Sequence, residues 1–455
     1  MLERKITKKL ENWLENDAKK ALFLVGARQI GKSFAIREFG KAHFKQFIEI
    51  NLYENTQARD VLLQANNAAD FITRVTVISG MQIIPGKTLI FIDEIQEAPD
   101  VMTMVKFLVE DGRCRWAFSG SMLGTQFKNV RSYPVGSVHE LSMSPLDFEE
   151  FCWAIGVTPA AFENIKQSCV SETPVEDYIH KAMMENFRAY LVVGGMPEVV
   201  QAFLDSKGDL ALVRELQTDL NKQYKRDISK YAGARSLYVQ SIFDLLPVQL
   251  EGETHRFVMN SIDENARYRG YERDFVWLEN AGVALKTNLV TEPKSPLLKT
   301  ANTTKFKLYQ SDVGMLMARY SLATAQAAYL DNKNPNLGGV YENAIAQQLA
   351  AQGLPLYFYQ TKKRGEVDFV TESNGGFAVP IEVKSGRYYH AHTALDNVLE
   401  NAGYEANLGI VLSRGNVERE GKVLYLPLYA IYLLPELLGN GEDEGEGFRI
   451  EVSVV

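Results

Sequence analysis

Residues 26–33 carry the spacing of a phosphate-binding loop. An apolar run, LFLV at 22–25, is typical of a buried strand, and it is followed by GARQIGKS, which matches the pattern G-x-x-x-x-G-K-[ST]. The glycines let successive backbone N–H groups point inward at phosphate oxygens, while the lysine reaches the β- and γ-phosphates and the serine binds Mg²⁺. A chance match in a strand-to-helix turn is the alternative. We therefore predict that ATP and Mg²⁺ bind at Gly26, Ala27, Arg28, Gln29, Ile30, Gly31, Lys32 and Ser33.

Two carboxylates follow a second apolar run. LIFI at 89–92 is typical of a central parallel strand, and it ends in Asp93 and Glu94. At the carboxyl end of a strand in an open α/β sheet, side chains lie where ligands bind. We predict that Asp93 holds Mg²⁺ together with Ser33, directly or through water, and that Glu94 polarises the attacking water. A helix N-cap after an ordinary strand is the alternative.

Three further residues are candidates for contact with the γ-phosphate. RWAFSGS at 115–121 predicts another core strand, and Ser119 and Ser121 are candidates to sense the γ-phosphate or to position water. A simple Ser-Gly turn is the alternative. In the basic run KQYKRDISK at 222–230, Arg226 is a candidate sensor or trans-acting arginine, because a planar guanidinium suits phosphate. A solvated helix face is the interpretation that we favour for this run.

The C-terminal part of the chain carries a second set of charged residues. A predicted helix contains Glu342, a predicted strand contains Asp368, and the paired strand AVPIEVK presents Glu382 and Lys384 on one face. This arrangement resembles the restriction-endonuclease-like core. The resemblance implies a divalent cation, Mg²⁺ or Mn²⁺, on Asp368 and Glu382, with Glu342 completing the site and Lys384 orienting the attacking water. Alternating charges on the solvent face of a β-hairpin are the alternative.

The nucleotide-binding motifs require an α/β scaffold to position them. Apolar strand-like runs alternate with helix-like stretches in the first part of the chain, which predicts a parallel sheet flanked by helices. Helix-like sequence then continues from 145 to about 230 and is interrupted by a turn at GGMP, 194–197.

The middle of the chain, from 236 to 292, reads as short helices followed by a strand, which suggests a winged helix. Winged helices read DNA in some proteins and only contact protein in others. The candidate helix carries the acids Glu272, Asp274 and Glu279 beside the basic Arg273, so it lacks the basic surface of a groove-reading helix. We therefore favour a structural or protein-contact role.

The chain as a whole resembles a family of bacterial and archaeal AAA-type P-loop ATPases. The motifs that carry the resemblance, over nearly the whole chain, are GARQIGKS, FIDEIQ, FSGS, SPLDFEEF, GGMPEVV, YKRDISK and EVDFV with IEVKSG. The resemblance implies ATP hydrolysis, a helical lid and a C-terminal domain of unknown function. Many members have Gly-Arg where this chain has Gly136-Ser137, so an arginine from that position is missing here. Arg28 and Arg131 remain, and many AAA-type sites borrow an arginine from a neighbouring subunit.

We predict the fold class α/β with five regions. Residues 1–145 form the P-loop AAA-type ATPase core, 146–232 a helical lid or linker, and 233–292 a winged-helix-like region. Residues 293–438 form a restriction-endonuclease-like α/β domain, and 439–455 an acidic tail.

Composition limits the classes of protein that fit. A chain of 455 residues is too long for one hydrophobic core. The net charge of −8 argues against a uniformly basic nucleic-acid-binding coat but is compatible with a local basic groove. Three scattered cysteines suit a reducing cytoplasm. No apolar run approaches the roughly 18 residues of a membrane span, and the charged N-terminus lacks a signal peptide, so we expect a soluble cytoplasmic protein without membrane contact.

Three functions fit these patterns. We favour an ATP-binding AAA-type ATPase whose nucleotide cycle is coupled to a nuclease-like domain that binds DNA or RNA. The first alternative is a nucleotide-dependent switch or protein-interaction module whose nuclease-like domain is inactive. The second is a defence-type nuclease whose ATPase only gates cleavage. Self-association or a protein partner would supply the missing arginine.

Overall fold

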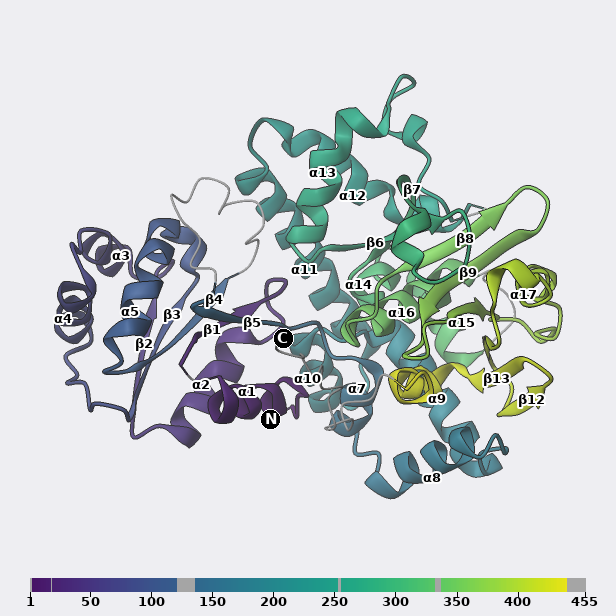
Figure 1. The fold of residues 1–455 in the computed structure, drawn as a ribbon, viewed down its shortest axis with the longest axis horizontal. Helices are drawn as coiled ribbons and strands as arrows, with labels where there is room; N and C mark the ends of the chain where they lie inside the picture. Colours follow the sequence, from purple (N-terminus) through teal and green to yellow (C-terminus); the bar gives the residue numbers. More distant parts are fainter. Residues whose placement is uncertain (1, 18, 121–135, 253–254, 332–336, 440–455) are drawn as a thin grey trace, which may run out of the picture.

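The computed structural model describes residues 2–17, 19–120, 136–252, 255–331 and 337–439. The chain forms two lobes, and the helix α11 (Leu210–Tyr231) lies between them (Figure 1). Ser121, Arg131 and the predicted acidic tail from residue 440 onward lie outside the described residues. Within the described part of the chain, no helix is long and apolar enough to cross a membrane.

The N-terminal lobe is built on a five-stranded sheet in which every pairing is parallel. The strand order is β2-β3-β4-β1-β5. The strands are β1 (Ala21–Val25), β2 (Gln46–Asn51), β3 (Thr88–Asp93), β4 (Arg115–Gly120) and β5 (Val138–Ser142). This arrangement confirms the predicted parallel sheet of the nucleotide-binding core. It also brings the loop after β1 and the carboxylates at the end of β3 to the same edge.

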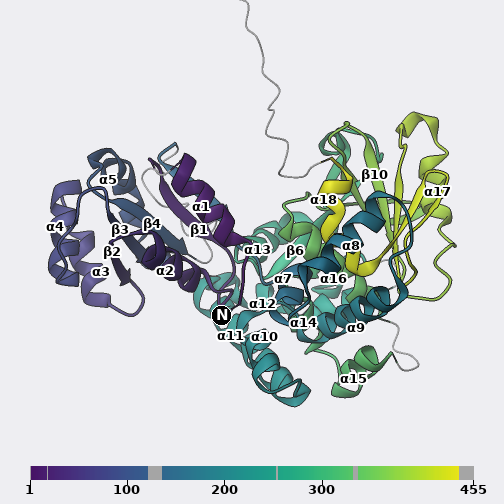
Figure 2. The same cartoon turned by 90° about the horizontal axis from the view of Figure 1, so that it is seen from below.

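Helices cover both faces of this sheet because alternate strand residues point to opposite sides. Leu22, Leu24 and Phe91 pack with α1 and α2, whereas Phe23 and Ile90 pack with α3, α4 and α5. Figure 2 shows the two groups of helices on opposite sides of the strands. The helices are α1 (Ile6–Asn16), α2 (Lys32–His43), α3 (Thr56–Leu63), α4 (Ala68–Ser79) and α5 (Val105–Asp111).

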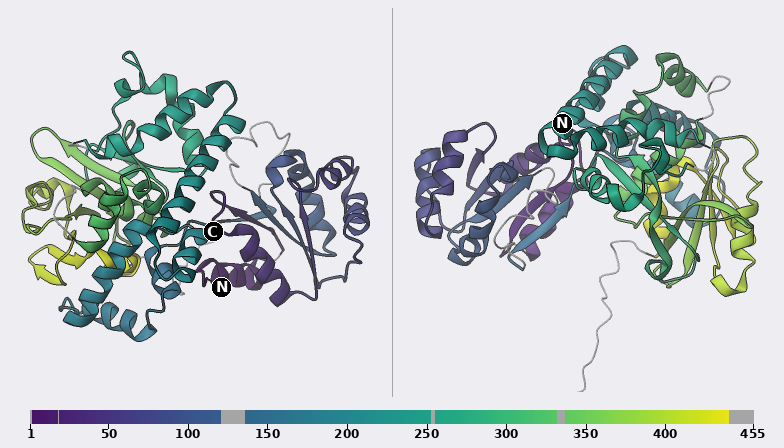
Figure 3. Two further views of the ribbon diagram at one scale, coloured as in Figure 1. Left: turned by 180° about the vertical axis from the view of Figure 1, so that it is seen from behind. Right: turned by 90° about the horizontal axis from the view of Figure 1, so that it is seen from above.

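Helices dominate the chain from 148 to 280, as the sequence predicts. They are α7 (Phe148–Ala154), α8 (Pro159–Val170), α9 (Asp177–Val193), α10 (Pro197–Asp205), α11, α12 (Ser236–Leu250) and α13 (Tyr268–Asn280). The predicted turn falls between α9 and α10. There, a Cβ on Gly195 would lie 1.9 Å from the carbonyl oxygen of Leu146, so only glycine fits. Figure 3 shows the two lobes in two further views.

The second lobe contains an eight-stranded mixed sheet of order β12-β13-β11-β10-β9-β8-β6-β7. Its strands are β6 (Ala284–Val290), β7 (Ala301–Gln310), β8 (Tyr357–Thr361), β9 (Gly365–Glu372), β10 (Ala378–Val383), β11 (Gly409–Ser413), β12 (Glu418–Glu420) and β13 (Val423–Pro427). The α-helices in this part of the chain are α14 (Val313–Met317), α15 (Leu322–Leu330), α16 (Gly338–Ala351), α17 (Thr393–Leu399) and α18 (Leu434–Leu437). Of these, α14, α16 and α17 contact strands of the sheet, whereas α15 packs against α9.

The hairpin β6–β7 belongs to this larger sheet. β6 pairs antiparallel with β7 and parallel with β8. The order α12, α13, β6, β7 is the helix-then-strand order predicted for the middle region, and the predicted boundary at 292/293 falls inside the hairpin. The winged-helix and restriction-endonuclease-like labels stay predictions.

Candidate functional site

The phosphate loop curls tightly between β1 and α2. Gly26, Gln29 and Gly31 adopt positive φ values of 149°, 63° and 92°. A Cβ on Gly26 would lie 2.2 Å from the carbonyl oxygen of Met143, so the backbone of this loop approaches the chain after β5 too closely for a side chain. The glycines of the loop therefore allow its backbone to form a tight curve at the N-terminus of α2, where backbone N–H groups can bind an anion.

Lys32 is buried and folded over its own loop. Its Nζ donates hydrogen bonds to the carbonyl oxygens of Gly26 at 3.0 Å and Ala27 at 2.6 Å. Burial lowers the pKa of Lys32 to about 8, and the carboxylates of Glu94 and Asp93 oppose that shift only in part. The ammonium group thus lies at the place where phosphate charge is expected.

The carboxylate of Asp93 accepts hydrogen bonds from several polar groups of the site. Its Oδ2 accepts hydrogen bonds from Ser33 Oγ at 2.8 Å and from Asn51 Nδ2 at 3.1 Å. Its Oδ1 accepts from Ser119 Oγ and, at 3.0 Å, from the backbone N–H of Glu94. The structure thus brings together four of the predicted residues, Ser33, Asp93, Glu94 and Ser119. Asn51 was missed, although it ends β2 in register with Asp93.

Glu94 faces a polar cavity of about 450 Å³. Its backbone adopts the left-handed conformation with φ 54°, which is uncommon for a residue other than glycine and is typical of functional sites. The same cavity is lined by Arg28, Tyr53, Arg226, Asp227 and Lys230. Arg226 is exposed, and within the described part of the chain its side chain forms no hydrogen bond or ion pair.

Helix α11 packs directly on the phosphate loop. Arg28 forms an ion pair with Asp227 and donates a hydrogen bond to Tyr231 Oη at 3.0 Å. Tyr224 Oη donates to the carbonyl oxygen of Arg28 at 3.2 Å, and Gln29 Nε2 donates to Gln223 Oε1 at 2.6 Å. The basic run at 222–230 is therefore only in part a solvated helix face, because one side of it contacts the loop and the polar cavity.

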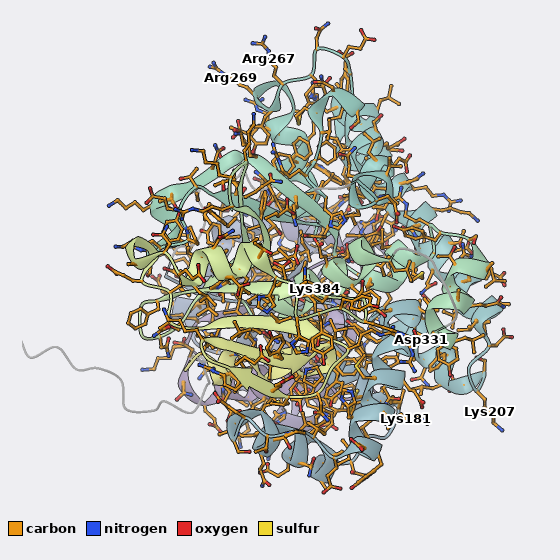
Figure 4. The ribbon with its side chains drawn as sticks, turned by 90° about the vertical axis from the view of Figure 1, so that its right-hand side faces the viewer. Lys181, Lys207, Arg267, Arg269, Asp331 and Lys384 are labelled. Atoms are coloured by element: carbon orange, nitrogen blue, oxygen red, sulfur yellow. The ribbon has the colours of Figure 1, made fainter. Side chains whose placement is uncertain are left out.

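The middle region also reaches the phosphate loop. Gly282, in the turn between α13 and β6, has φ +67°, and a Cβ on it would lie 2.9 Å from the backbone nitrogen of Ala27. On α13 itself, Asp274 is buried and forms an ion pair with Arg235, so it does not add to the acidic surface expected of this helix. Arg267 and Arg269 point outward at the edge of the molecule (Figure 4).

A second cavity, of about 710 Å³ and mostly apolar, opens beside Gly31. It lies between α1, α2 and the start of α10, and its lining includes Phe34, Ala35, Phe39 and Pro197. It touches the phosphate loop at Gly31, whereas the polar cavity touches it at Arg28 and Gln29. The loop thus lies between a polar cavity and an apolar one.

In the second lobe, two of the four predicted nuclease-like residues, Glu342 and Asp368, lie around a buried lysine. The side chain of Lys307, on β7, is fully buried. Its Nζ lies 3.1 Å from Glu342 Oε2, 2.6 Å from Glu366 Oε1 and 3.7 Å from Asp368 Oδ1. Lys384 Nζ donates to Glu382 Oε1 at 2.7 Å. Lys307 and Glu366 had no recognisable signal in the sequence.

Charges in this cluster interact strongly because water is excluded from it. Burial would raise the pKa of Glu342, but Lys307 and His255 outweigh burial and lower it to about 2. Burial and the neighbouring carboxylates of Glu342 and Glu382 raise the pKa of Asp368 well above its usual range. Across the described ranges, no group of three or more His, Cys, Asp and Glu side chains is arranged to hold a metal ion.

Comparison with known proteins identifies the N-terminal lobe. A family model described as an AAA domain matches residues 18–152. This region is an AAA-type P-loop ATPase domain. Two domains of unknown function, DUF8612 and DUF4143, match residues 184–326 and 337–431. No curated protein matches the chain.

Several solved structures align with the ATPase chain at low similarity. A Walker-type ATPase of Pyrococcus abyssi is 14% identical over 70% of this chain and 96% of its own, with a TM-score of 0.42. The Orc1 protein of Aeropyrum pernix, solved in complex with DNA, is 11% identical over 72% of this chain and 91% of its own, with a TM-score of 0.26. Cdc6p of Pyrobaculum aerophilum is 12% identical over 72% of this chain and 92% of its own, with a TM-score of 0.24. At these scores the ATPase assignment rests on the family model and the motifs.

Proposed function

We propose that this ATPase is an ATP-driven switch in which α11 carries the state of the phosphate loop to the C-terminal lobe. The direct contact between α11 and the loop is the observation that carries the proposal. The nuclease-like lobe is the output side of the switch, and the ATPase site in the N-terminal lobe is the input side.

ATP is proposed to bind across the loop from one cavity to the other. Its phosphates accept hydrogen bonds from the loop backbone, and Lys32 turns from the carbonyl oxygens of Gly26 and Ala27 to the β- and γ-phosphates. The apolar cavity beside Gly31 takes the nucleoside, since it is roomy, apolar and adjacent to the start of α2. The polar cavity then faces the γ-phosphate.

Hydrolysis is proposed to take place on the side of Glu94. Glu94 accepts a proton from the attacking water, while Arg226 and Lys230, in the same cavity, offset the negative charge that develops on the γ-phosphate. The Ser33 hydroxyl and the Asp93 carboxylate, 2.8 Å apart, are hard oxygen donors that suit Mg²⁺. When bound, Mg²⁺ would neutralise phosphate charge.

Helix α11 is suited to transmit a change at the loop because its two halves contact different lobes. Its C-terminal half holds Arg28 through Asp227 and Tyr231. Near its middle, Asn221 Nδ2 donates to the carbonyl oxygen of Met315 on α14 at 3.0 Å, and in its first half Arg214 Nη2 donates to that of Ala318 at 3.0 Å. A helix of 22 residues is about 33 Å long, so a single rigid element connects the loop with the second lobe.

Phosphate would compete with Asp227 for Arg28. Arg28 stands inside the phosphate loop, and its guanidinium pairs with Asp227 in the structure. Triphosphate in the loop would bring negative charge close to both side chains, which attracts Arg28 and repels Asp227. The ion pair is therefore expected to weaken when ATP binds and to re-form when phosphate leaves, which would move α11 relative to the loop.

The first experiment tests ATP turnover through Glu94. In Glu94→Gln the amide cannot accept the proton of the attacking water, so the rate should fall by a factor of about 10² to 10⁴, while ATP binding persists. Phosphate release and binding of a fluorescent ATP analogue measure the two properties separately. A wild-type rate no greater than that of Glu94→Gln would contradict the proposed site.

The second experiment tests the coupling through α11. Hydrogen exchange should change at α14 when ATP binds to the wild-type protein, and this change should be lost or reduced in Asp227→Asn. Asp219→Asn is a matched control, because Asp219 lies on the same helix and pairs only with the exposed Lys222 in the described structure. An unaltered response in Asp227→Asn would rule out the ion pair as the link, even if the ATPase remains active.

DNA or RNA is the ligand class that we propose for the output lobe. Lys362 and Lys363 are exposed at the β8–β9 turn, and Arg387 and Tyr388 are exposed after β10, with Tyr388 at 92%. Basic side chains neutralise phosphates, and an exposed aromatic ring offers a stacking surface for bases. Fluorescence anisotropy of labelled oligonucleotides, with and without ATP, tests this proposal, and absence of salt-dependent binding under both conditions would contradict it.

A further inference from the structure

We propose that Lys307 is a resident cation that takes the place of a divalent metal in the nuclease-like cluster, so that this cluster binds no Mg²⁺ and cleaves no phosphodiester. The inference concerns the second lobe and does not depend on the switch proposed above. It departs from the expectation that Asp368 and Glu382 hold a metal ion.

The position of the ammonium group is the first argument. Lys307 Nζ lies within 3.1 Å of oxygens of both Glu342 and Glu366 and 3.7 Å from Asp368, so it occupies the point that these carboxylates share. An ammonium group has three donors and no acceptor, which matches three surrounding acids. A metal ion at this point would have to displace it, because two cations in contact repel each other strongly in a buried site.

The burial of Lys307 is the second argument. Its side chain has no exposed surface, although it extends from β7, the edge strand of the sheet, which pairs with β6. Its ammonium also lies 5.3 Å from the centre of the Phe358 ring. Lys384, in contrast, lies at the surface of the lobe with 27% of its side chain exposed (Figure 4). Lys307 therefore cannot swing into solvent as Lys384 can.

The third argument is that other carboxylate oxygens of the cluster already have partners within the protein and are not free to bind a metal. Tyr309 Oη donates to Glu342 Oε2 at 2.9 Å, and His255 Nδ1 lies 2.6 Å from Glu342 Oε1. The backbone N–H of Val383 donates to Asp368 Oδ2 at 2.8 Å.

Glu382 leaves only one oxygen for a metal. Its Oε1 accepts from Lys384, whereas its Oε2 is buried and has no hydrogen-bond partner in the described structure. A metal at this oxygen could take a second ligand from Asp368 Oδ1, but that oxygen lies 3.7 Å from the Lys307 ammonium, so a divalent cation shared by these two carboxylates would lie against a buried positive charge. The donor set therefore does not fit the divalent cation that the nuclease-like resemblance implies.

Titration with Mn²⁺, followed by electron paramagnetic resonance, tests the inference. The full chain is used without nucleotide in a Ser33→Ala background, which removes the hydroxyl predicted to bind metal at the phosphate loop. We expect no Mn²⁺ binding that depends on the cluster. Binding that is lost in Asp368→Asn would overturn the inference, as would Mg²⁺- or Mn²⁺-dependent cleavage of DNA or RNA that is lost in Lys384→Ala.

Removal of the lysine should create the missing cation site. In Lys307→Ala the acids lose their cation, so we expect a lower melting temperature than in the wild type and Mn²⁺ binding at least about tenfold tighter, with Mn²⁺ restoring part of the melting temperature. Lys286→Ala is the control, because Lys286 lies on the neighbouring strand and contacts Tyr268 rather than the acids.

Each result with these variants has a defined meaning. A Lys307→Ala protein that folds and gains no affinity for Mn²⁺ would overturn the inference. If Lys307→Ala does not fold, the wild-type titration and the cleavage assay still decide it.

Discussion

The affinity of this ATPase for ATP should fall steeply above pH 8 because of Lys32. Burial in the nucleotide-free protein lowers the pKa of Lys32 to about 8. The phosphates of ATP bind the protonated ammonium, so at pH values above 8 the protein must take up a proton before the lysine can contact them. Below pH 8 Lys32 is already charged, and the affinity should be nearly constant.

The size of the effect follows from the lowered pKa. At pH 9 only about one Lys32 in ten is protonated in the free protein, so the apparent Kd for ATP should be about tenfold higher than at pH 7. That factor corresponds to about 1.4 kcal/mol of binding free energy. A fluorescent ATP analogue, titrated from pH 6.5 to 9.5 at constant ionic strength, measures the change directly.

Lys32→Gln is the control for this titration, since its amide has no proton to gain in this range. The variant should bind the analogue more weakly, with a Kd that does not change between pH 7 and pH 9. An unchanged wild-type affinity over the same range would refute the buried, low-pKa lysine. The same pH dependence in Lys32→Gln would assign the effect to another group.

Two substitutions test the surroundings of the phosphate loop. Gly282→Ala adds a Cβ 2.9 Å from the backbone nitrogen of Ala27, so a cost of about 1–3 kcal/mol for overpacking should weaken ATP binding about fivefold or more, measured by the same titration. Gly353→Ala, which has a similar positive φ but open space around the added Cβ, should lose stability without losing affinity; equal affinities in the two variants would contradict the contact. Ala35→Leu should fill part of the apolar cavity and weaken ATP binding while leaving inorganic tripolyphosphate binding unchanged; equal weakening of both ligands in calorimetry would place the nucleoside elsewhere.

The sequence was most informative where a function depends on neighbouring residues. The phosphate loop is one continuous pattern, and the carboxylates of Asp93 and Glu94 end an obvious strand, so the closeness of Ser33 and Asp93 could be predicted. Asn51 could not, because its hydrogen bond to Asp93 depends on the register of β2 against β3. Register between strands far apart in the sequence has no local signature.

The contacts that connect distant segments were beyond sequence reasoning. The basic run on α11 looked like a solvated face, although Tyr224 and Ile228, four residues apart, do mark its buried stripe. Lys307 was the least predictable residue. It stands in an alternating strand, KFKLYQ, and a lysine in such a strand is usually exposed, so nothing indicated its burial among three acids.

The shared eight-stranded sheet has a consequence for how this chain can be divided. β6 and β7 fall within the region that matches one domain of unknown function, and β8 to β13 within the region that matches the other. Because β6 hydrogen-bonds to β8, a fragment cut between residues 326 and 337 would leave an unpaired strand edge on each side of the cut. Such edges recruit strands from other molecules. The two matched regions are therefore one folding unit, and separately expressed halves should aggregate unless they are produced together and allowed to re-form the sheet.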